Sequence, residues 1–216
     1  MPSANVHLNG RRLRAVILDY GEVLSFPPPR ESTDAMAELF HVSREKFREF
    51  YYAERNPYDR GAITAERYWQ AIARDAGLAL STQQIEWLRR TDVEMWSHVN
   101  PAMLDWARRL RNQGVQTAVL SNMHADMAKS VREQFGWIAD FQCFALSAEL
   151  GMAKPDPQIF QHCLDCLKVR AEEALFIDDK EQHTRAAEAM GIAGICAGSP
   201  EEIRTKLKAG GWDGPL

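Results

Sequence analysis

Cysteine is scarce in this sequence, and positive charge is not in excess. Four cysteines in 216 residues are too few for a small disulfide-stapled scaffold. The formal net charge of −4 gives the chain no overall attraction to nucleic acid or to an anionic membrane. Binding of a small anionic molecule would therefore need a local cluster of donors.

Long apolar runs are missing as well. Residues 1–14 contain no apolar h-region, and no segment approaches the length of a membrane span. We therefore expect a soluble cytoplasmic protein with reduced cysteines. Cys163 and Cys166 form a C-x-x-C pattern, but the apolar residues around them repeat at helical spacing, so we interpret both as core residues.

The sequence does contain a series of short apolar runs, which predict buried strands. These runs lie at 13–18, 117–121, 141–147, 174–177 and, more weakly, 194–197. Amphipathic helices are predicted at 101–112, 124–135, 156–168 and 181–190. Strands that alternate with helices indicate an α/β fold with a doubly wound parallel sheet, in which ligands bind beyond the carboxyl ends of the strands.

Residues 26–98 interrupt this alternation. They begin with PPPRES, a stiff exit from the first strand region, and continue as helical patterns in which Thr64 and Ser81 are predicted N-caps. We predict an all-helical cap domain at 26–98, inserted into a core domain made of 1–25 and 99–216. The position of this insertion places it over the end of the sheet where a site would lie. The final segment, AGGWDGPL, is expected to fray.

Polar residues follow four of the predicted strands. Asp19 ends the first, Ser121 ends the second, Lys154 follows the third, and Asp178 and Asp179 end the fourth. If the strands are parallel, these side chains meet in one crevice. Singly, Asp19 and Ser121 are explained as turn or helix caps and Lys154 as a solvated loop residue. The adjacent carboxylates of Asp178 and Asp179 are harder to explain without a cation.

Together these residues suit phosphoryl transfer. An ionised aspartate such as Asp19 is a competent nucleophile, and Mg²⁺ would screen its repulsion with a phosphate. Asp19 and Asp179 offer carboxylate ligands from facing strand ends. Lys154 adds a positive charge, and the Ser121 hydroxyl, with nearby backbone N–H groups, would bind a phosphate oxygen.

Four segments, LDYGEVL, LSN, KPDP and IDDKEQH, are similar in this order to the four motifs of the haloacid dehalogenase (HAD) superfamily, in its phosphatase-rich branch. The resemblance spans essentially the whole chain, because the insertion looks like that family's helical cap. It implies an HAD Rossmann-like core and a phosphoric monoester phosphatase that acts on a small phosphorylated metabolite.

The resemblance also implies individual roles. Asp19 matches the nucleophile that forms an aspartyl-phosphate and binds Mg²⁺. Ser121, with Asn122 beside it, matches the phosphate-binding hydroxyl, and Lys154 matches the lysine that bridges phosphate and nucleophile. Asp179 matches the principal acidic metal ligand, with Asp178 as a second carboxylate.

Position 21 departs from the family pattern. Phosphatases of the family usually carry a second Asp two residues after the nucleophile, as general acid and base, whereas this chain has Gly21. The backbone carbonyl of Gly21 can still bind the metal, but glycine cannot transfer a proton. Three explanations stay open: a leaving group of low basicity such as an anomeric sugar hydroxyl, a substitute group such as Glu22 or a cap residue, or slow or absent turnover. Some members that resemble sugar-1-phosphate phosphatases share the Asp-x-Gly pattern.

Two other functions stay open for the same reason. The 2-haloacid dehalogenases of the family also lack the second Asp and need no Mg²⁺, but they typically carry Tyr two positions after the nucleophile, whereas Tyr20 is one position after it. The acidic pair at 178–179 argues against them. A non-catalytic protein that senses a phosphate ligand is the other alternative.

The insertion offers candidates for substrate contact. Arg60 precedes a glycine in a predicted loop and would bind a sugar or a carboxylate, with a solvated Arg60 as the alternative. Tyr52 and Trp69 follow helical apolar spacing and are predicted to pack inside the cap. His124 and His183 are predicted to be helix-capping or solvated, with contact to the water shell of the metal as the alternative for His183.

Overall fold

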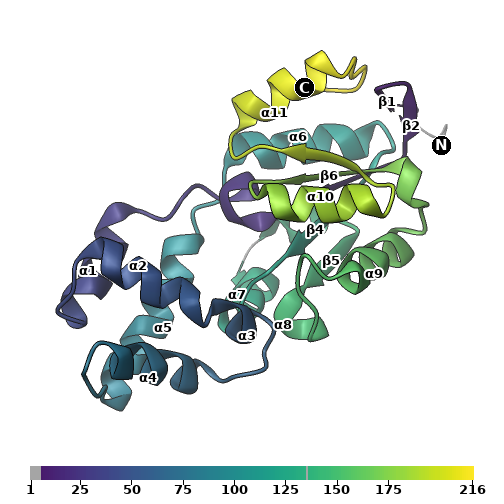
Figure 1. Ribbon diagram of the computed structural model, residues 1–216. Helices are drawn as coiled ribbons and strands as arrows, with labels where there is room; N and C mark the ends of the chain where they lie inside the picture. The colour runs from purple at the N-terminus through teal and green to yellow at the C-terminus, as the bar shows by residue number, and fades with distance from the viewer. Residues whose placement is uncertain (1–5, 135) are drawn as a thin grey trace.

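The centre of the protein is a five-stranded parallel sheet, seen in the computed structural model, which describes residues 6–134 and 136–216 (Figure 1). The strand order is β5–β4–β3–β6–β7. The strands are β3 (Ala15–Leu18), β4 (Gln116–Ser121), β5 (Cys143–Leu146), β6 (Ala174–Asp178) and β7 (Ala193–Cys196). β3 and β6 are buried along their whole length, because helices cover both faces of the sheet. Residues 1–5 and 135, which the predicted core and helix segments include, lie outside the described residues.

Helices cover the two faces of this sheet (Figure 1). On one face, the helices α6 (Pro101–Asn112), α7 (Ala125–Gln134) and α11 (Pro200–Ala209) pack against the buried side chains that the strands present on that side. On the other face lie α9 (Pro157–Leu167) and α10 (Glu181–Ala189). The predicted fold class, a doubly wound α/β sheet with an inserted helical region, is therefore confirmed.

The inserted helices form a separate body at the carboxyl end of the sheet (Figure 1). They are α1 (Arg30–Leu39), α2 (Arg44–Ala53), α3 (Arg55–Asp59), α4 (Ala65–Asp75) and α5 (Thr82–Trp96). Thr64 and Ser81 cap α4 and α5 as predicted, since their hydroxyls accept backbone N–H bonds. The two connections to the core run side by side, with Ser25 bridged to Val99. We call α1–α5 the cap.

Several elements were not anticipated. The antiparallel strands β1 (Val6–Leu8) and β2 (Arg11–Leu13) form a hairpin beside the core, α8 (Ser147–Leu150) follows β5, and α11 closes one face. Short 3₁₀ turns span Gly136–Asp140 and Ala171–Glu173. Asn9 and Gly10, which connect β1 to β2, both adopt positive φ, as a tight two-residue hairpin turn requires.

The expectation that the C-terminal segment frays is wrong. Trp212 is only 7% exposed and belongs to the main core. The indole N–H groups of Trp106 and Trp212 both donate to the carbonyl of Pro215. Burial of one indole outweighs the tendency of a glycine-rich end to fray.

The interpretation of the C-x-x-C pair holds for one cysteine only. Cys163 is buried among the apolar residues of α9, as predicted. Cys166 lies on the exposed edge of that helix and is paired in a disulfide with Cys143 of β5, their Cα atoms 6.1 Å apart. Helical spacing placed Cys166 beside the apolar stripe of α9, but it did not reveal that Cys143 of β5 lies next to Cys166.

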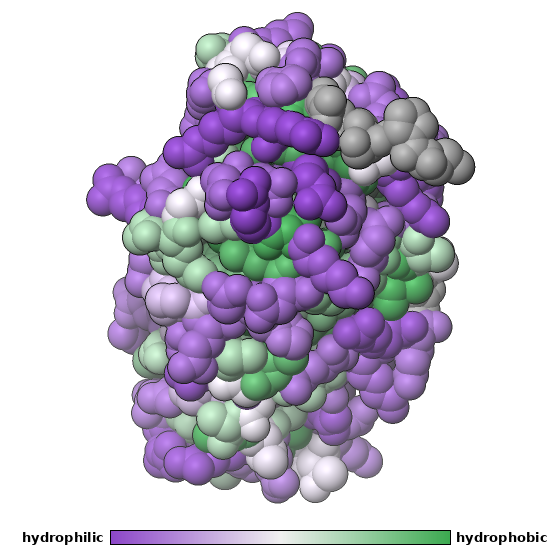
Figure 2. All heavy atoms as spheres, turned by 90° about the vertical axis from the view of Figure 1, so that its right-hand side faces the viewer, coloured by the Kyte–Doolittle hydropathy of each residue, from purple (hydrophilic) through white to green (hydrophobic). Residues whose placement is uncertain are grey.

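The face of the molecule opposite the cap is covered mainly by hydrophilic side chains, with apolar side chains visible in gaps between them (Figure 2). Within the described part of the chain, no helix combines the length and the apolar character needed to cross a bilayer.

Candidate active site

Asp19 stands where β3 ends and the chain turns toward the cap. Its carboxylate accepts the backbone N–H of Tyr20 over 2.7 Å and begins the single wide turn Tyr20–Leu24. Glu22 lies at φ 59° in this turn, and Ser25 N–H donates to the carbonyl of Tyr20. This unusual backbone lets a fully buried strand end in an aspartate that faces a cavity.

Lys154 joins two carboxylates at the switch point of the sheet. Its Nζ lies 2.8 Å from Oδ1 of Asp19 and 2.5 Å from Oδ2 of Asp178, and its side chain is 1% exposed. Burial alone would lower the pKa of Lys154, but the two carboxylates together raise it. Burial raises the pKa of Asp19, and Lys154 partly offsets that rise. The ammonium is therefore held charged beside the predicted nucleophile.

Ser121 is the last residue of β4, the strand beside β3, and Asn122 follows it. Ser121 is buried and lines the same cavity as Asp19 and Lys154. The Asn122 side chain exchanges two hydrogen bonds with the Lys154 backbone, over 2.8 and 2.9 Å. The predicted substrate contact of Asn122 stays a prediction, and the structure adds that Asn122 positions Lys154.

Three carboxylates gather beyond β3 and β6. Asp19, Asp178 and Asp179 each offer an oxygen, and these atoms all lie within 4.8 Å of one another. Hard carboxylate oxygens at this spacing suit Mg²⁺. Asp178 is already engaged, because it also accepts the backbone N–H of Lys180 over 2.8 Å. The Asp179 carboxylate makes no ion pair with any described residue, and burial, with the charge of Asp19, raises its pKa to about 7.

His183 belongs to this cluster, so the expectation that it caps a helix or is solvated is wrong. It is 7% exposed, and its Nδ1 lies 3.0 Å from Oδ1 of Asp178. Burial by itself would raise the pKa of Asp178, but Lys154 and His183 lower it. The first turn of α10 turns His183 back onto the strand end, a contact that its sequence position did not reveal.

A cavity of about 670 Å³ opens in front of these residues, between the core and the cap. Its core wall carries Asp19, Gly21, Ser121, Lys154 and Asp179, and its cap wall carries a set of larger polar and aromatic residues, among them Arg48, Tyr51, Tyr52, Arg55, Asp59 and Trp96. The structure thus brings the predicted site residues of the core to one cavity, with Asp178 buried behind its wall. It does not bring Arg60 there.

Arg60 is exposed at the end of α3 and is not among the described residues that line the cavity. Arg60 and Gly61 do lie in a turn between two cap helices, as predicted, but it is on α3 that Arg55 and Asp59, four residues apart, share the face toward the cavity. Arg60 is one residue further around and points elsewhere. The i, i+4 spacing of Arg55 and Asp59 was the signal available in the sequence.

Tyr52 also differs from its prediction. It is 47% exposed and lines the cavity, whereas Trp69 is fully buried in the cap as expected. Helical spacing placed Tyr52 next to the inner stripe, but the core domain does not cover it.

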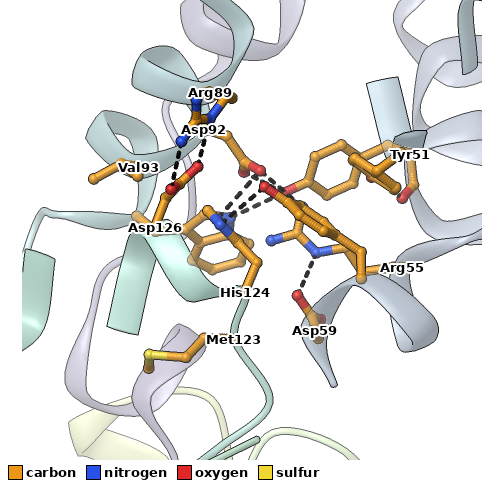
Figure 3. Close-up of polar contacts among 12 residues, drawn as sticks. Tyr51, Arg55, Asp59, Arg89, Asp92, Val93, Met123, His124 and Asp126 are labelled. Carbon is orange, nitrogen blue, oxygen red and sulfur yellow. Dashed lines mark hydrogen bonds and ion pairs between the residues drawn. The ribbon is translucent and has the colours of Figure 1, made fainter. Parts of the chain in front are cut away.

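A buried polar network joins the cap to the core (Figure 3). Arg55 bonds Asp59 through Nε and Asp92 through a terminal nitrogen, each over 2.9 Å, and Tyr51 donates to Asp92 over 2.6 Å. His124, from the loop after β4, is fully buried, with its ring stacked on Tyr58. The expectation of a capping or solvated His124 is therefore wrong. Burial lowers the pKa of His124 to about 4.

Comparison with known proteins places this arrangement in a family. Residues 9–191 match the haloacid dehalogenase-like hydrolases. The chain belongs to that family. It is 30% identical over 215 residues to mouse acyl-CoA dehydrogenase family member 10, covering 94% of this chain but only a fifth of that much longer protein (20%).

Two further relatives match over most of their length. Sesquiterpene phosphatase astK of Aspergillus oryzae is 27% identical over 189 residues, which cover 84% of this chain and 88% of that protein. The crystal structure of a HAD family enzyme from Bacteroides thetaiotaomicron, in complex with magnesium and inorganic phosphate, is 25% identical with a TM-score of 0.68. It covers 85% of this chain and 93% of that one.

Proposed function

We propose that this HAD-like hydrolase is a Mg²⁺-dependent phosphatase of a small phosphorylated metabolite, with sugar phosphates as the first class to test. One observation carries the proposal: Asp19, held 2.8 Å from a buried ammonium, shares a cavity with the carboxylate of Asp179, which makes no ion pair with any described residue. A nucleophile, a fixed positive charge and a further acidic metal ligand are the parts that phosphoryl transfer to a carboxylate requires.

Each residue has a defined task in this reaction. An Asp19 oxygen attacks phosphorus, and the bond from phosphorus to the leaving oxygen breaks. Lys154 and the Ser121 hydroxyl bind the non-bridging oxygens of the phosphoryl group, and water later hydrolyses the aspartyl-phosphate. Asp19, Asp179, Asp178 and the carbonyl of Gly21 would hold Mg²⁺, which supplies charge neutralisation at the phosphate.

The relatives support this assignment by analogy. One is named a phosphatase, and the Bacteroides thetaiotaomicron enzyme was crystallised with magnesium and inorganic phosphate. The cavity of about 670 Å³ also suits a metabolite-sized ligand.

Hydrolysis of p-nitrophenyl phosphate, with Mg²⁺ and with EDTA, tests the proposal. We expect Mg²⁺-dependent turnover by the wild type and none by Asp19→Asn. Asp126→Asn is the matched control, because Asp126 pairs with Arg89 and does not line the cavity. A second readout is independent of turnover: Mg²⁺ should raise the melting temperature of the wild type but not of Asp179→Asn.

A phosphate sensor is the second candidate, because Gly21 removes the usual proton donor. Absence of turnover in the wild type, together with Mg²⁺-dependent binding of inorganic phosphate, would favour that function. Metal-independent release of halide from a 2-haloacid, with no phosphatase activity, would instead favour a dehalogenase.

A further inference from the structure

The step that lacks a residue is protonation of the leaving oxygen. A Cβ atom at position 21 would lie 3.4 Å from Cζ3 of Trp96, and the next nearest atoms belong to the same indole ring. Trp96 is the last residue of α5 in the cap. A side chain at position 21 would therefore begin in contact with the indole ring of the cap residue Trp96. Because glycine itself has no group that can transfer a proton, the proton has to come from another wall of the cavity.

Asp59 is a carboxyl group in that wall. It ends α3, is 7% exposed and lines the same cavity as Asp19 and Lys154. Its Oδ1 accepts Nε of Arg55 over 2.9 Å, whereas no bond to Oδ2 is found among the described residues. In Figure 3, Asp59 lies on one side of Arg55 and the rest of the network lies on the other. The backbone of Asp59 is held too, since its carbonyl accepts the hydroxyl of Ser147 in α8.

The two carboxyl groups of the network differ in the number of hydrogen bonds that they accept. Arg55 is the guanidinium between two buried carboxyl groups, Asp59 and Asp92. Asp92 is fully buried and accepts hydrogen bonds from the Tyr51 hydroxyl and the Arg55 guanidinium. Its Oδ2 also lies 3.3 Å from Nε2 of His124. Asp92 therefore has more hydrogen-bond donors than Asp59, whose carboxyl accepts only from Arg55 among the described residues.

The surroundings of Asp59 agree with this difference. Burial and the charge of Asp92 together raise the pKa of Asp59 to about 6, against the opposing charges of Arg55 on its own helix and Lys180 after β6. A carboxylic acid with a pKa near neutrality can give up and recover a proton during turnover. His124 is neutral at this pH and adds no second cation.

We propose that Asp59, delivered by the cap, is the general acid and base that Gly21 cannot be. This inference rests on the proposed phosphatase function. When Asp19 attacks phosphorus and the bond to the leaving oxygen breaks, the Asp59 carboxyl gives its proton to that oxygen, which departs as an alcohol. The Asp59 carboxylate then takes a proton from the water that attacks the aspartyl-phosphate, so the enzyme returns to its starting state.

The test is a comparison of leaving groups in Asp59→Asn. The parameter is kcat/KM, because it covers only the steps up to departure of the leaving group. An alkyl phosphate needs its leaving oxygen protonated, whereas p-nitrophenolate leaves without help. We expect kcat/KM for the alkyl phosphate to fall roughly 10²–10⁴-fold, and kcat/KM for p-nitrophenyl phosphate to fall by less than about 3-fold.

Two controls separate chemistry from structure. Asp126→Asn breaks an ion pair between cap and core outside the cavity. It should lower kcat/KM for both substrates by the same factor or leave both unchanged. If Asp59→Asn does not fold, the wild-type pH profile is the alternative readout. There kcat/KM for the alkyl phosphate should decline above about pH 6, relative to kcat/KM for p-nitrophenyl phosphate.

Equal losses on both substrates, no loss on either, or identical pH profiles would overturn the role of Asp59. Each of these outcomes leaves the phosphatase function intact. Absence of p-nitrophenyl phosphate turnover in the wild type would instead overturn the proposed function itself.

Discussion

The side chain of Asn122 holds the backbone of Lys154 by two hydrogen bonds. Its Nδ2 donates to the Lys154 carbonyl over 2.9 Å, and the Lys154 N–H donates to its Oδ1 over 2.8 Å. The two residues are 32 positions apart, so this pair ties the loop after β4 to the loop that carries the buried ammonium. The position of Lys154 relative to Asp19 therefore depends on Asn122.

Replacement of Asn122 should impair both activity and stability. In Asn122→Ala we expect kcat/KM for p-nitrophenyl phosphate to fall by roughly 10- to 100-fold, because the Lys154 ammonium loses its fixed position. The free energy of unfolding should fall by about 1–3 kcal/mol, because two buried backbone groups lose their partners. Urea denaturation measures the second effect. Asn112→Ala, on the exposed end of α6, is the control, and an Asn122 variant that behaves like it would contradict the positioning role.

Arg55 and Arg60 should differ sharply although they lie on the same short segment. Arg55→Met leaves the carboxylates of Asp59 and Asp92 without their guanidinium, so we expect the unfolding free energy to fall by about 3–5 kcal/mol. Arg60→Ala should change it by less than about 0.5 kcal/mol and leave KM unaltered, since Arg60 is exposed outside the cavity. Chemical denaturation and steady-state kinetics check both variants. A rise in KM for Arg60→Ala alone would restore Arg60 as a substrate contact.

His124 should make the protein less stable in mild acid. Its pKa is about 4 in the folded protein, because burial disfavours the imidazolium, against an ordinary value of 6.5. The unfolded chain therefore binds the proton first as pH falls. The stability that depends on neutral His124 is complete above about pH 6.5, declines below it and is lost near pH 4, a total of roughly 3 kcal/mol.

Comparison of variants isolates this effect from other titrations. His124→Gln should show a flatter dependence of unfolding free energy on pH between 7 and 4 than the wild type. His98→Gln, at an exposed position, should follow the wild-type curve. Parallel curves for the wild type and His124→Gln would show that His124 is not buried as a neutral imidazole.

The core strands could be predicted from the sequence because their apolar runs depend on local composition. The sequence predicted strands at 117–121 and 174–177, and the structure has β4 at Gln116–Ser121 and β6 at Ala174–Asp178. A strand buried on both faces must be apolar throughout, so the pattern survives without knowledge of its neighbours. The polar residue that ends each run marks the edge of the core for the same reason.

The cap was harder to interpret. Its helices and the N-caps Thr64 and Ser81 follow from local propensity and were predicted. Which face of a cap helix meets the core depends on how two domains dock, and helical spacing contains no information about that. Arg60 was therefore preferred to Arg55 and Asp59, and Tyr52 was assigned to the wrong side.

By itself, the sequence determined a parallel α/β sheet, a helical insertion after the first strand, and the order of polar residues at the strand ends. Asp19, Ser121, Lys154 and Asp179 follow from it because parallel strands bring their carboxyl ends to one edge. Only the tertiary structure decided that Asn122 holds Lys154, that His183 contacts Asp178, and that Asp59 faces the cavity. These are contacts between segments far apart in the chain, or between a helix face and its neighbour, and they depend on packing rather than on local pattern.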